Sequence, residues 1–107
     1  MAFTTDYVAP EPSRSEVDAL PGDTLLEFGA PWCGYCMAAQ PLLANAMASR
    51  TDLRHIKVED GKGQPLGRSF RVKLWPTLVV LRDGEELARV VRPSSSEEIE
   101  RVLALLE

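Results

Sequence analysis

The sequence predicts one α/β domain in which a central mixed β-sheet is flanked by helices. At 107 residues the chain is long enough to bury a core without disulfides or metals, and too short for two domains. Short apolar runs of strand type alternate with stretches of helical pattern, an order that predicts helices layered on a sheet. The Asp-Gly pair at positions 83–84 marks a tight hairpin turn, so two of the strands should be antiparallel neighbours.

The first half of the chain predicts a helix, a strand and a second helix. We expect residues 1–12 to be a loosely ordered segment or an edge strand. Ser13 and Glu16 have the spacing of a capping box and predict a short helix that begins there. The run TLLEF at 24–28 is typical of a strand buried on both faces. The Ala- and Leu-rich stretch 37–49 predicts the second helix.

The second half predicts a strand, a short helix, a hairpin and a final helix. The expected strands span 53–59, 77–81 and 86–91, and the expected helices span 64–70 and a segment that begins at 94–96. Alternation along the first of these strands places Leu53, His55 and Lys57 on one face. Apolar residues at spacings of three and four give the final helix one face that can pack on the sheet.

The composition is that of an ordinary globular protein and excludes several function classes. Hydrophobic residues make up 45% and charged residues 26% of the chain, and the net charge is -4. Lys and Arg are scattered, so the basic patch of a nucleic-acid-binding protein is missing, and the acidic balance disfavours an anionic membrane surface. The N-terminus lacks the basic and apolar regions of a secretory signal, and no apolar run is long enough to span a membrane. If the printed chain is the complete product, we therefore expect a cytoplasmic protein.

Two cysteines, Cys33 and Cys36, carry the strongest functional signal. A bridge between them closes a very short loop and restricts the unfolded chain little, so the pair is a poor structural staple. A zinc site needs four ligands, and His55 is the one other residue of the usual kind, which argues against a site within one chain. A metal or cluster shared between two chains, and a pair of inert buried thiols, stay open as alternatives.

The position of the pair suits thiol–disulfide exchange. Exchange proceeds by attack of a thiolate on a disulfide sulfur, through a mixed disulfide. Cys33 follows a predicted strand at the start of a helix, where unpaired N–H groups and the helix dipole stabilise a thiolate. Cys36 lies one turn further along the same face, and Gly34 leaves the turn sterically open. We therefore predict that Cys33 is the attacking nucleophile and Cys36 the more buried resolving thiol.

Around these cysteines the sequence resembles the thioredoxin family. The family's hallmark Trp-Cys-Gly-x-Cys after a central strand appears here at residues 32–36. The resemblance extends over roughly residues 24–103. Within it, Pro41 stands at the family's helix-kink position, Pro76 at its cis-proline before a strand, and the Asp-Gly pair at its hairpin turn. The resemblance implies a thioredoxin-like fold for the single domain.

The resemblance also implies roles for four residues near the pair. Pro76 should face the cysteines through a cis peptide bond, the alternative being an ordinary proline at a strand start. The backbone of Trp75 would pair with a substrate chain. Glu27 stands at the family's buried acid, which assists proton transfer from the resolving thiol, and Lys57 should be its neighbour on the adjacent strand. An acid inside TLLEF is hard to place on an exposed face, although a partly exposed glutamate without a role is the alternative.

Several residues depart from the family's pattern. Tyr35 replaces a proline between the cysteines, Trp75 replaces a small β-branched residue, and Arg92 replaces a glycine in the groove rim. Gly29 replaces an aromatic residue, which should loosen the packing behind the site. We expect an aromatic, partly cationic lip beside the nucleophile, unless Trp75 turns inward as packing. The predicted substrate-binding residues are Trp32, Gly34, Tyr35, Trp75, Pro76 and Arg92.

These observations predict a protein-disulfide reductase that exchanges the Cys33–Cys36 dithiol with protein substrates. No cofactor beyond the two cysteines and no metal is implied, and neither nucleic acid nor membrane is expected as a partner. The resemblance implies a thioredoxin-reductase-like electron donor, and we expect a monomer whose client carries an acidic feature opposite Arg92. Two alternatives stay open: a thioredoxin-like partner-binding module with incidental redox activity, and a disulfide oxidase or isomerase.

Overall fold

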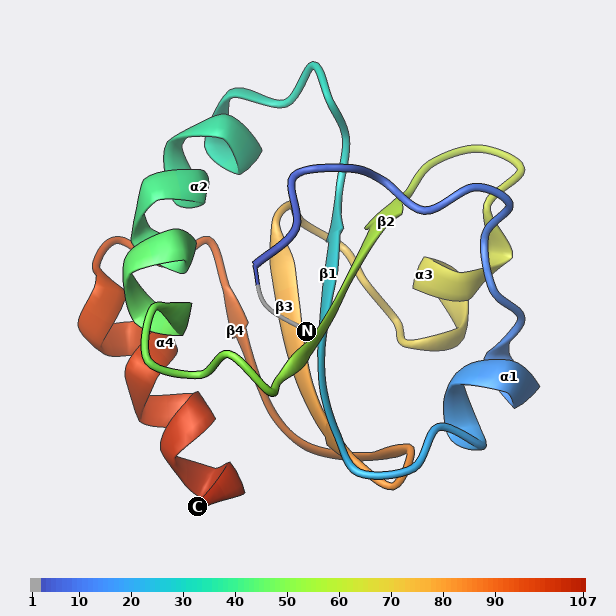
Figure 1. The fold of residues 1–107 in the computed structure, drawn as a ribbon. Coiled ribbons are helices and arrows are strands. Elements are labelled where there is room, and N and C mark those ends of the chain that lie inside the picture. The colour runs from blue at the N-terminus through green and yellow to red at the C-terminus, as the bar shows by residue number, and fades with distance from the viewer. Residues whose placement is uncertain (1–2) are drawn as a thin grey trace.

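In the computed structural model, which describes residues 3–107, four strands and the helices around them follow the predicted order (Figure 1). The strands are β1 (Asp23–Gly29), β2 (Arg54–Glu59), β3 (Thr77–Arg82) and β4 (Glu85–Val91). The helices are α1 (Arg14–Asp18), α2 (Gly34–Met47), α3 (Pro65–Ser69) and α4 (Ser96–Leu103), and a 3-10 turn over Ala104–Leu106 follows α4.

The sheet has the strand order β2-β1-β3-β4. Strand β1 runs parallel to β2 and antiparallel to β3, and β3 runs antiparallel to β4, so the predicted mixed sheet is confirmed. β1 is an inner strand and is buried from Thr24 to Gly29, as its continuous apolar run indicated. In the register of β1 with β2, Glu27 lies opposite Lys57. The sheet thus brings a carboxyl and an amine to neighbouring positions on adjacent strands.

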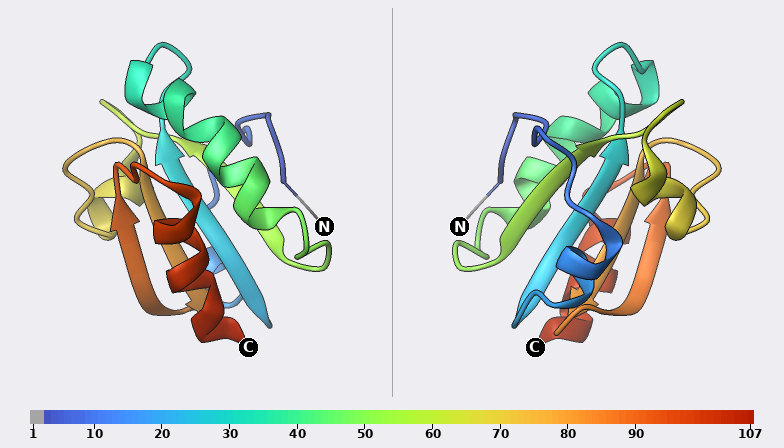
Figure 2. Two further views of the ribbon diagram at one scale, coloured as in Figure 1. Left: turned by 90° about the vertical axis from the view of Figure 1, so that its left-hand side faces the viewer. Right: turned by 90° about the vertical axis from the view of Figure 1, so that its right-hand side faces the viewer.

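Helices cover both faces of the sheet (Figure 2). Helices α2 and α4 pack on one face, in an apolar cluster that includes Leu25 of β1 and Leu43 of α2. Helices α1 and α3 lie over the other face, where Phe28 of β1 packs with Phe70 just after α3. Because side chains alternate along a strand, Glu27 shares the face of Leu25 and points toward α2. The fold therefore directs the predicted acid toward the helix that carries Cys36.

Helix α2 begins at Gly34, earlier than the Ala- and Leu-rich stretch from 37 indicated. Cys33 is the N-cap of the helix, and its sulfur accepts a hydrogen bond from the N–H of Cys36. Glycine and tyrosine are weaker helix formers than alanine and leucine, so propensity alone does not mark the first turn. The cap places the two cysteines in the first turn of the helix.

Two local predictions are confirmed. Ser13 and Glu16 form the reciprocal hydrogen bonds of a capping box at the start of α1. Asp83 and Gly84 turn the β3–β4 hairpin with φ angles of 51° and 81°, the left-handed pair that a type I′ turn needs. A Cβ on Gly84 would also collide with the backbone of Asp18, so the turn requires glycine for space as well as for conformation.

The N-terminal segment over 3–12, for which we expected a loose segment or an edge strand, forms no strand and lies against β2 (Figure 1). The N–H of Val8 donates to the carbonyl of Lys57 at 2.8 Å. The N–H of Thr4 donates to Nδ1 of His55 at 2.9 Å, and the Phe3 ring stacks on the same imidazole with centroids 5.5 Å apart. The segment therefore covers side chains of β2 that face the interior.

Candidate active site

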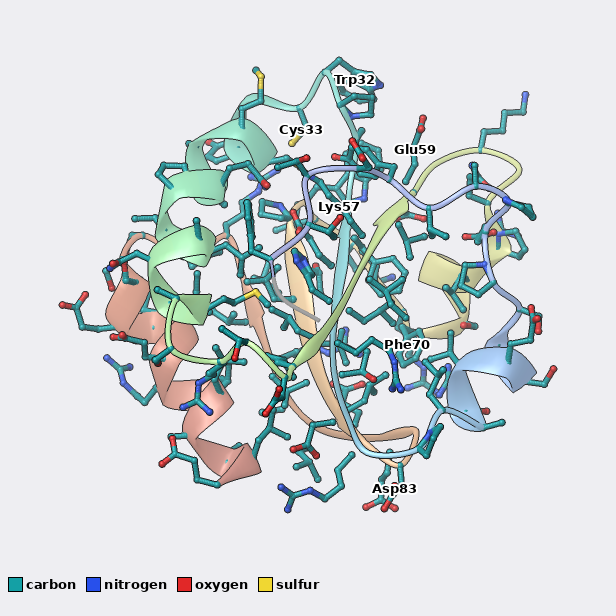
Figure 3. The ribbon with its side chains drawn as sticks, viewed as in Figure 1. Trp32, Cys33, Lys57, Glu59, Phe70 and Asp83 are labelled. Atoms are coloured by element: carbon teal, nitrogen blue, oxygen red, sulfur yellow. The ribbon has the colours of Figure 1, made fainter. Side chains whose placement is uncertain are left out.

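Cys33 ends the connection from β1 to α2, at one end of the sheet (Figure 3), and Cys36 lies in the first turn of α2. Both are free thiols. Cys33 is 6% exposed and Cys36 is 2% exposed, which is the order predicted from the sequence. The N–H of Cys36 donates to Sγ of Cys33 at 3.2 Å. This hydrogen bond and the positive end of α2 both stabilise negative charge on Cys33.

Cys36 resists ionisation. Burial raises the pKa of its thiol to about 12, and the hydrogen bond with Cys33 adds to the rise. The negative charges of Cys33 and Glu27 act in the same direction. At neutral pH Cys36 is therefore a neutral thiol, and its attack on a mixed disulfide needs a group that takes its proton.

Glu27 is fully buried, so the burial predicted for it is confirmed. Its Oε1 lies 2.8 Å from Nε2 of His55, which is itself 2% exposed. Its Oε2 accepts a hydrogen bond from Nε2 of Gln40 at 2.9 Å. Both carboxyl oxygens are thus held by side chains from two different elements, β2 and α2. A role of Glu27 in proton transfer stays a prediction.

Lys57 is the strand neighbour of Glu27, as predicted, but its ammonium reaches a different side chain. Its Nζ donates to Oε1 of Gln40 at 3.0 Å and lies 4.8 Å from the centroid of the Tyr7 ring. Gln40 in turn donates to Glu27 and, at 2.9 Å, to the carbonyl of Cys36. The part of the chain that the structure describes contains no direct Lys57–Glu27 ion pair, because the amide of Gln40 lies between the two groups.

Sequence reasoning missed Gln40 and considered His55 only as a metal ligand. A signal was present for each. Gln40 follows Cys36 by four residues, which puts the two on one face of α2. His55 precedes Lys57 by two residues and so shares its face of β2. The sequence does not show that both side chains lie within hydrogen-bonding distance of Glu27.

Gly29 and Tyr7 close the site beside Cys36. A Cβ on Gly29 would lie 2.7 Å from Sγ of Cys36 and 3.5 Å from the hydroxyl of Tyr7. The expectation of loose packing at Gly29 is therefore wrong, because the thiol and the phenol occupy that space. Burial raises the pKa of the Tyr7 phenol, and the nearby charges of Cys36 and Glu27 raise it further.

A pocket of about 290 Å³ opens beside this group of side chains, and Tyr7, Cys36, Gln40 and Lys57 are among the residues that line it. The pocket thus opens to Gln40 and Lys57, while Glu27 and His55 are not among its lining residues.

Among residues 3–107, no group of three or more His, Cys, Asp or Glu side chains is arranged to hold a metal ion. In that same range, no helix combines the length and apolar character needed to cross a membrane.

Trp75 and Pro76 lie just before β3, and Trp75 packs against the cysteine pair. The peptide bond between them is cis, as the resemblance implied, and Pro76 is buried. Trp75 is half-buried against the cysteine pair and meets the ring of Trp32 edge-on, with centroids 5.4 Å apart. Its Nε1 donates to Oδ2 of Asp60 at 2.8 Å. Trp75 therefore turns toward the cysteines, while Trp32 is 71% exposed.

Tyr35 and Arg92 complete the rim. Tyr35 is 60% exposed, and the guanidinium of Arg92 lies 3.9 Å from the centroid of its ring. Nε of Arg92 donates to the carbonyl of Trp75 at 2.8 Å. The φ angle of Arg92 is 50°, in the left-handed region that favours glycine, which agrees with a position where the family carries glycine. Trp32, Tyr35 and Arg92 thus form an exposed aromatic and cationic lip beside the cysteine pair, whereas Trp75, which we expected in that lip, turns inward and packs against the cysteines.

Comparison with known proteins agrees with this geometry. The thioredoxin family model matches residues 6–104. The chain is 32% identical over 82 residues to thioredoxin H2-1 of Oryza sativa subsp. japonica, a match that covers 77% of this chain and 59% of that protein. It is 34% identical over 70 residues to thioredoxin of Chlamydia pneumoniae, a match that covers 65% of this chain and 69% of that protein.

A likeness to a solved structure extends over almost the whole chain. Thioredoxin 2 from Pseudomonas aeruginosa, in its reduced form, is 56% identical with a TM-score of 0.87, and the match covers 97% of this chain and 96% of that one. The matched part of the rice protein is less than two thirds of its length, whereas the bacterial structure is matched nearly end to end. Since the family model spans most of the chain and the fold agrees, the protein belongs to the thioredoxin family.

Proposed function

We propose that the protein is a thiol–disulfide oxidoreductase that works as a reductant of protein disulfides. The observation that carries this proposal is the free Cys33–Cys36 pair in the first turn of α2, with the N–H of Cys36 donating to Sγ of Cys33. Family membership and the likeness to a thioredoxin in its reduced form support it.

The proposed reaction transfers two electrons in two steps. The Cys33 thiolate attacks one sulfur of the client disulfide, and the other client sulfur leaves as a thiolate that takes a proton from water. Cys36 then gives its proton to Glu27 and attacks Sγ of Cys33, which expels the second client thiolate. That thiolate also takes a proton from water, so the client ends as a dithiol and the protein as a Cys33–Cys36 disulfide. The proton on Glu27 is then released to solvent.

The proposed client surface is the lip of Trp32, Tyr35 and Arg92 together with Gly34, Trp75 and Pro76. Exposed aromatic side chains next to a reactive sulfur favour the docking of a polypeptide. The carbonyl of Trp75 accepts from Nε of Arg92, so a client strand that pairs with this carbonyl lies beside the guanidinium. The guanidinium is then placed to meet an acidic group on the client.

The first test is the redox equilibrium of the cysteine pair. The protein is equilibrated in dithiothreitol buffers of graded potential, free thiols are alkylated, and the adducts are counted by mass. We expect a midpoint near thioredoxin's value of about -270 mV. A midpoint above about -200 mV, closer to isomerases and oxidants, would replace the reductant with an oxidase or isomerase. Client binding and biological rescue by a Cys33→Ser/Cys36→Ser variant would instead indicate a binding module.

The second test concerns Arg92. Two cystine peptides that differ only by glutamate or glutamine beside the disulfide are compared as substrates. We expect the glutamate peptide to be reduced faster, by no more than about fivefold, because an exposed ion pair contributes at most about 1 kcal/mol. Arg92→Gln should abolish the difference and leave the glutamine peptide's rate nearly unchanged. An equal preference in the wild-type protein and the variant would remove Arg92 from client selection.

The electron donor, the monomeric state and the cytoplasmic location stay predictions. We propose a thioredoxin-reductase-like flavoprotein as donor, because the family works with protein partners of that class. Reduction of the pair by such an enzyme, followed through consumption of its nicotinamide cofactor, is the direct check.

A further inference from the structure

We propose that Gln40 and His55 are positioning residues of the resolving step, which hold Glu27 in place as the proton acceptor for Cys36. This inference deepens the proposed function and rests on it. It concerns side chains to which sequence reasoning gave no role in the exchange. Their contacts to Glu27 come from opposite sides, one from α2 and one from β2.

The amide of Gln40 has a single orientation in which all its hydrogen bonds are made. Its Nε2 carries two hydrogens, and it donates to Oε2 of Glu27 and to the carbonyl of Cys36. Its Oε1 accepts from the ammonium of Lys57. A flipped amide would place its oxygen against a carboxylate and a carbonyl, and its NH₂ against an ammonium. The orientation of the Gln40 amide is therefore fixed, and the amide links the ammonium of Lys57 to the carboxyl of Glu27 through two hydrogen bonds.

His55 contacts the other carboxyl oxygen of Glu27, and the contact with Thr4 fixes which ring nitrogen of His55 carries the hydrogen. Its Nδ1 accepts the N–H of Thr4, so the hydrogen of a neutral imidazole lies on Nε2. That hydrogen points at Oε1 of Glu27, 2.8 Å from Nε2. The stacked ring of Phe3 and the burial of the imidazole keep water away. A second proton on His55 would face the N–H of Thr4, so His55 is a fixed donor.

The consequence for Glu27 is a carboxyl group held through both oxygens without a direct cation. Hydrogen bonds to the charged form favour it, and both oxygens receive one. The titratable groups near this carboxyl are His55 and Lys57 from β2, Cys36 from α2, and Tyr7 from the N-terminal segment. From β3, the residue paired with Glu27 is the uncharged Leu78. Loss of either donor should therefore make proton transfer from Cys36 to Glu27 less favourable.

The test separates the two steps of exchange with a chromogenic disulfide, dithiobis(nitrobenzoate). Attack by Cys33 releases the first nitrothiobenzoate in a phase that depends on reagent concentration. Resolution by Cys36 releases the second in a phase that does not. Both phases are followed by stopped flow across a range of pH in the wild type, Gln40→Met and His55→Leu. Gln64→Met is the matched control, because Gln64 lies before α3 and its side chain makes no capping hydrogen bond.

We expect the pH at which the second phase is half-maximal to rise by about one unit in Gln40→Met and in His55→Leu, because each loses a hydrogen bond to a charged group. At neutral pH the second phase should slow about tenfold while the first phase keeps its rate. His55→Gln, whose amide can still donate to Glu27, should recover most of the loss. In a Glu27→Gln background, Gln40→Met should have little further effect, because the two side chains act as a unit.

Three results would overturn the inference. One is an unchanged pH profile of the second phase in both variants. Another is a uniform slowing at every pH, which would indicate a structural role only. The third is full additivity of Gln40→Met with Glu27→Gln. Failure of the proposed function has a different signature, since it would appear as a midpoint above about -200 mV in the redox equilibrium of the wild-type pair, and not as a difference between the variants.

Discussion

At the scale of single residues, the site is defined by how closely side chains approach Cys36. Gly29 is the clearest case. The family often has an aromatic residue at this position, so the sequence predicted that glycine would leave loose packing. In the structure the sulfur of Cys36 and the hydroxyl of Tyr7 fill the space. The thiol can therefore approach the end of β1 closely. That proximity is part of the burial that raises the pKa of Cys36.

Gly29→Ala tests this close approach. The new methyl would lie 2.7 Å from Sγ of Cys36, so the first turn of α2 has to shift. We expect a loss of about 1–3 kcal/mol in the free energy of unfolding, the usual cost of overpacking, and a slower second phase with dithiobis(nitrobenzoate). Urea unfolding of the reduced protein and stopped flow measure the two effects.

Gly34→Ala is the control for stability. Its methyl meets open space at a helical position, so the free energy of unfolding should not fall. Equal stability of Gly29→Ala and wild type would show that Cys36 has room to move, and would contradict the packing account.

At the same scale, sequence and structure agree on some side chains and differ on others for a physical reason. Burial of Glu27 was predictable, because a charged residue inside an apolar run of an inner strand has no exposed face available. Its contact with Gln40 was not, because it depends on how far α2 lies from the sheet. Lys57 was predictable as a strand neighbour, but strand register does not say where a long flexible side chain ends.

At the scale of elements, the strands and the hairpin followed directly from pattern. The inner strand β1, the hairpin strands β3 and β4 and the Asp-Gly turn lie close to their expected positions. For α2, the run of helix formers indicated a start at residue 37, whereas the cysteine motif placed Cys33 at the start of the helix, and the structure agrees with the motif. The cap formed by Cys33 also supplies the hydrogen bond to its sulfur that the chemistry uses.

The N-terminal segment was the least predictable element. It has no periodic pattern, and its place depends on contacts with β2 that are distant in sequence. Thr4 fixes the tautomer of His55, and Tyr7 lies over Lys57 and beside Gly29. A segment expected to be loose or an edge strand therefore supplies part of the wall of the site.

At the scale of the whole molecule, the fold gathers one site from six parts of the chain (Figure 1). They are the N-terminal segment, β1, the first turns of α2, strand β2, the loop before β3 and the residue that follows β4. Groups that are neutral in this setting make the stability of the molecule depend on pH. Cys36 and Tyr7 both have raised pKa values, so the folded protein keeps protons that the unfolded chain releases.

The reduced protein should therefore lose stability in alkali. The pKa of Cys36 rises from an ordinary 9.0 to about 12, so its contribution to stability is complete below pH 9.0 and is lost as pH rises through about 12. Tyr7 acts in the same direction, because burial favours its neutral phenol. Urea unfolding under reducing conditions, at pH values below, within and above this window, measures the fall. Cys36→Ser should show a shallower fall, since serine does not titrate there. A wild-type slope no steeper than that of the variant would mean that the Cys36 thiol ionises as readily in the folded protein as in the unfolded chain, and that the resolving step needs no proton acceptor.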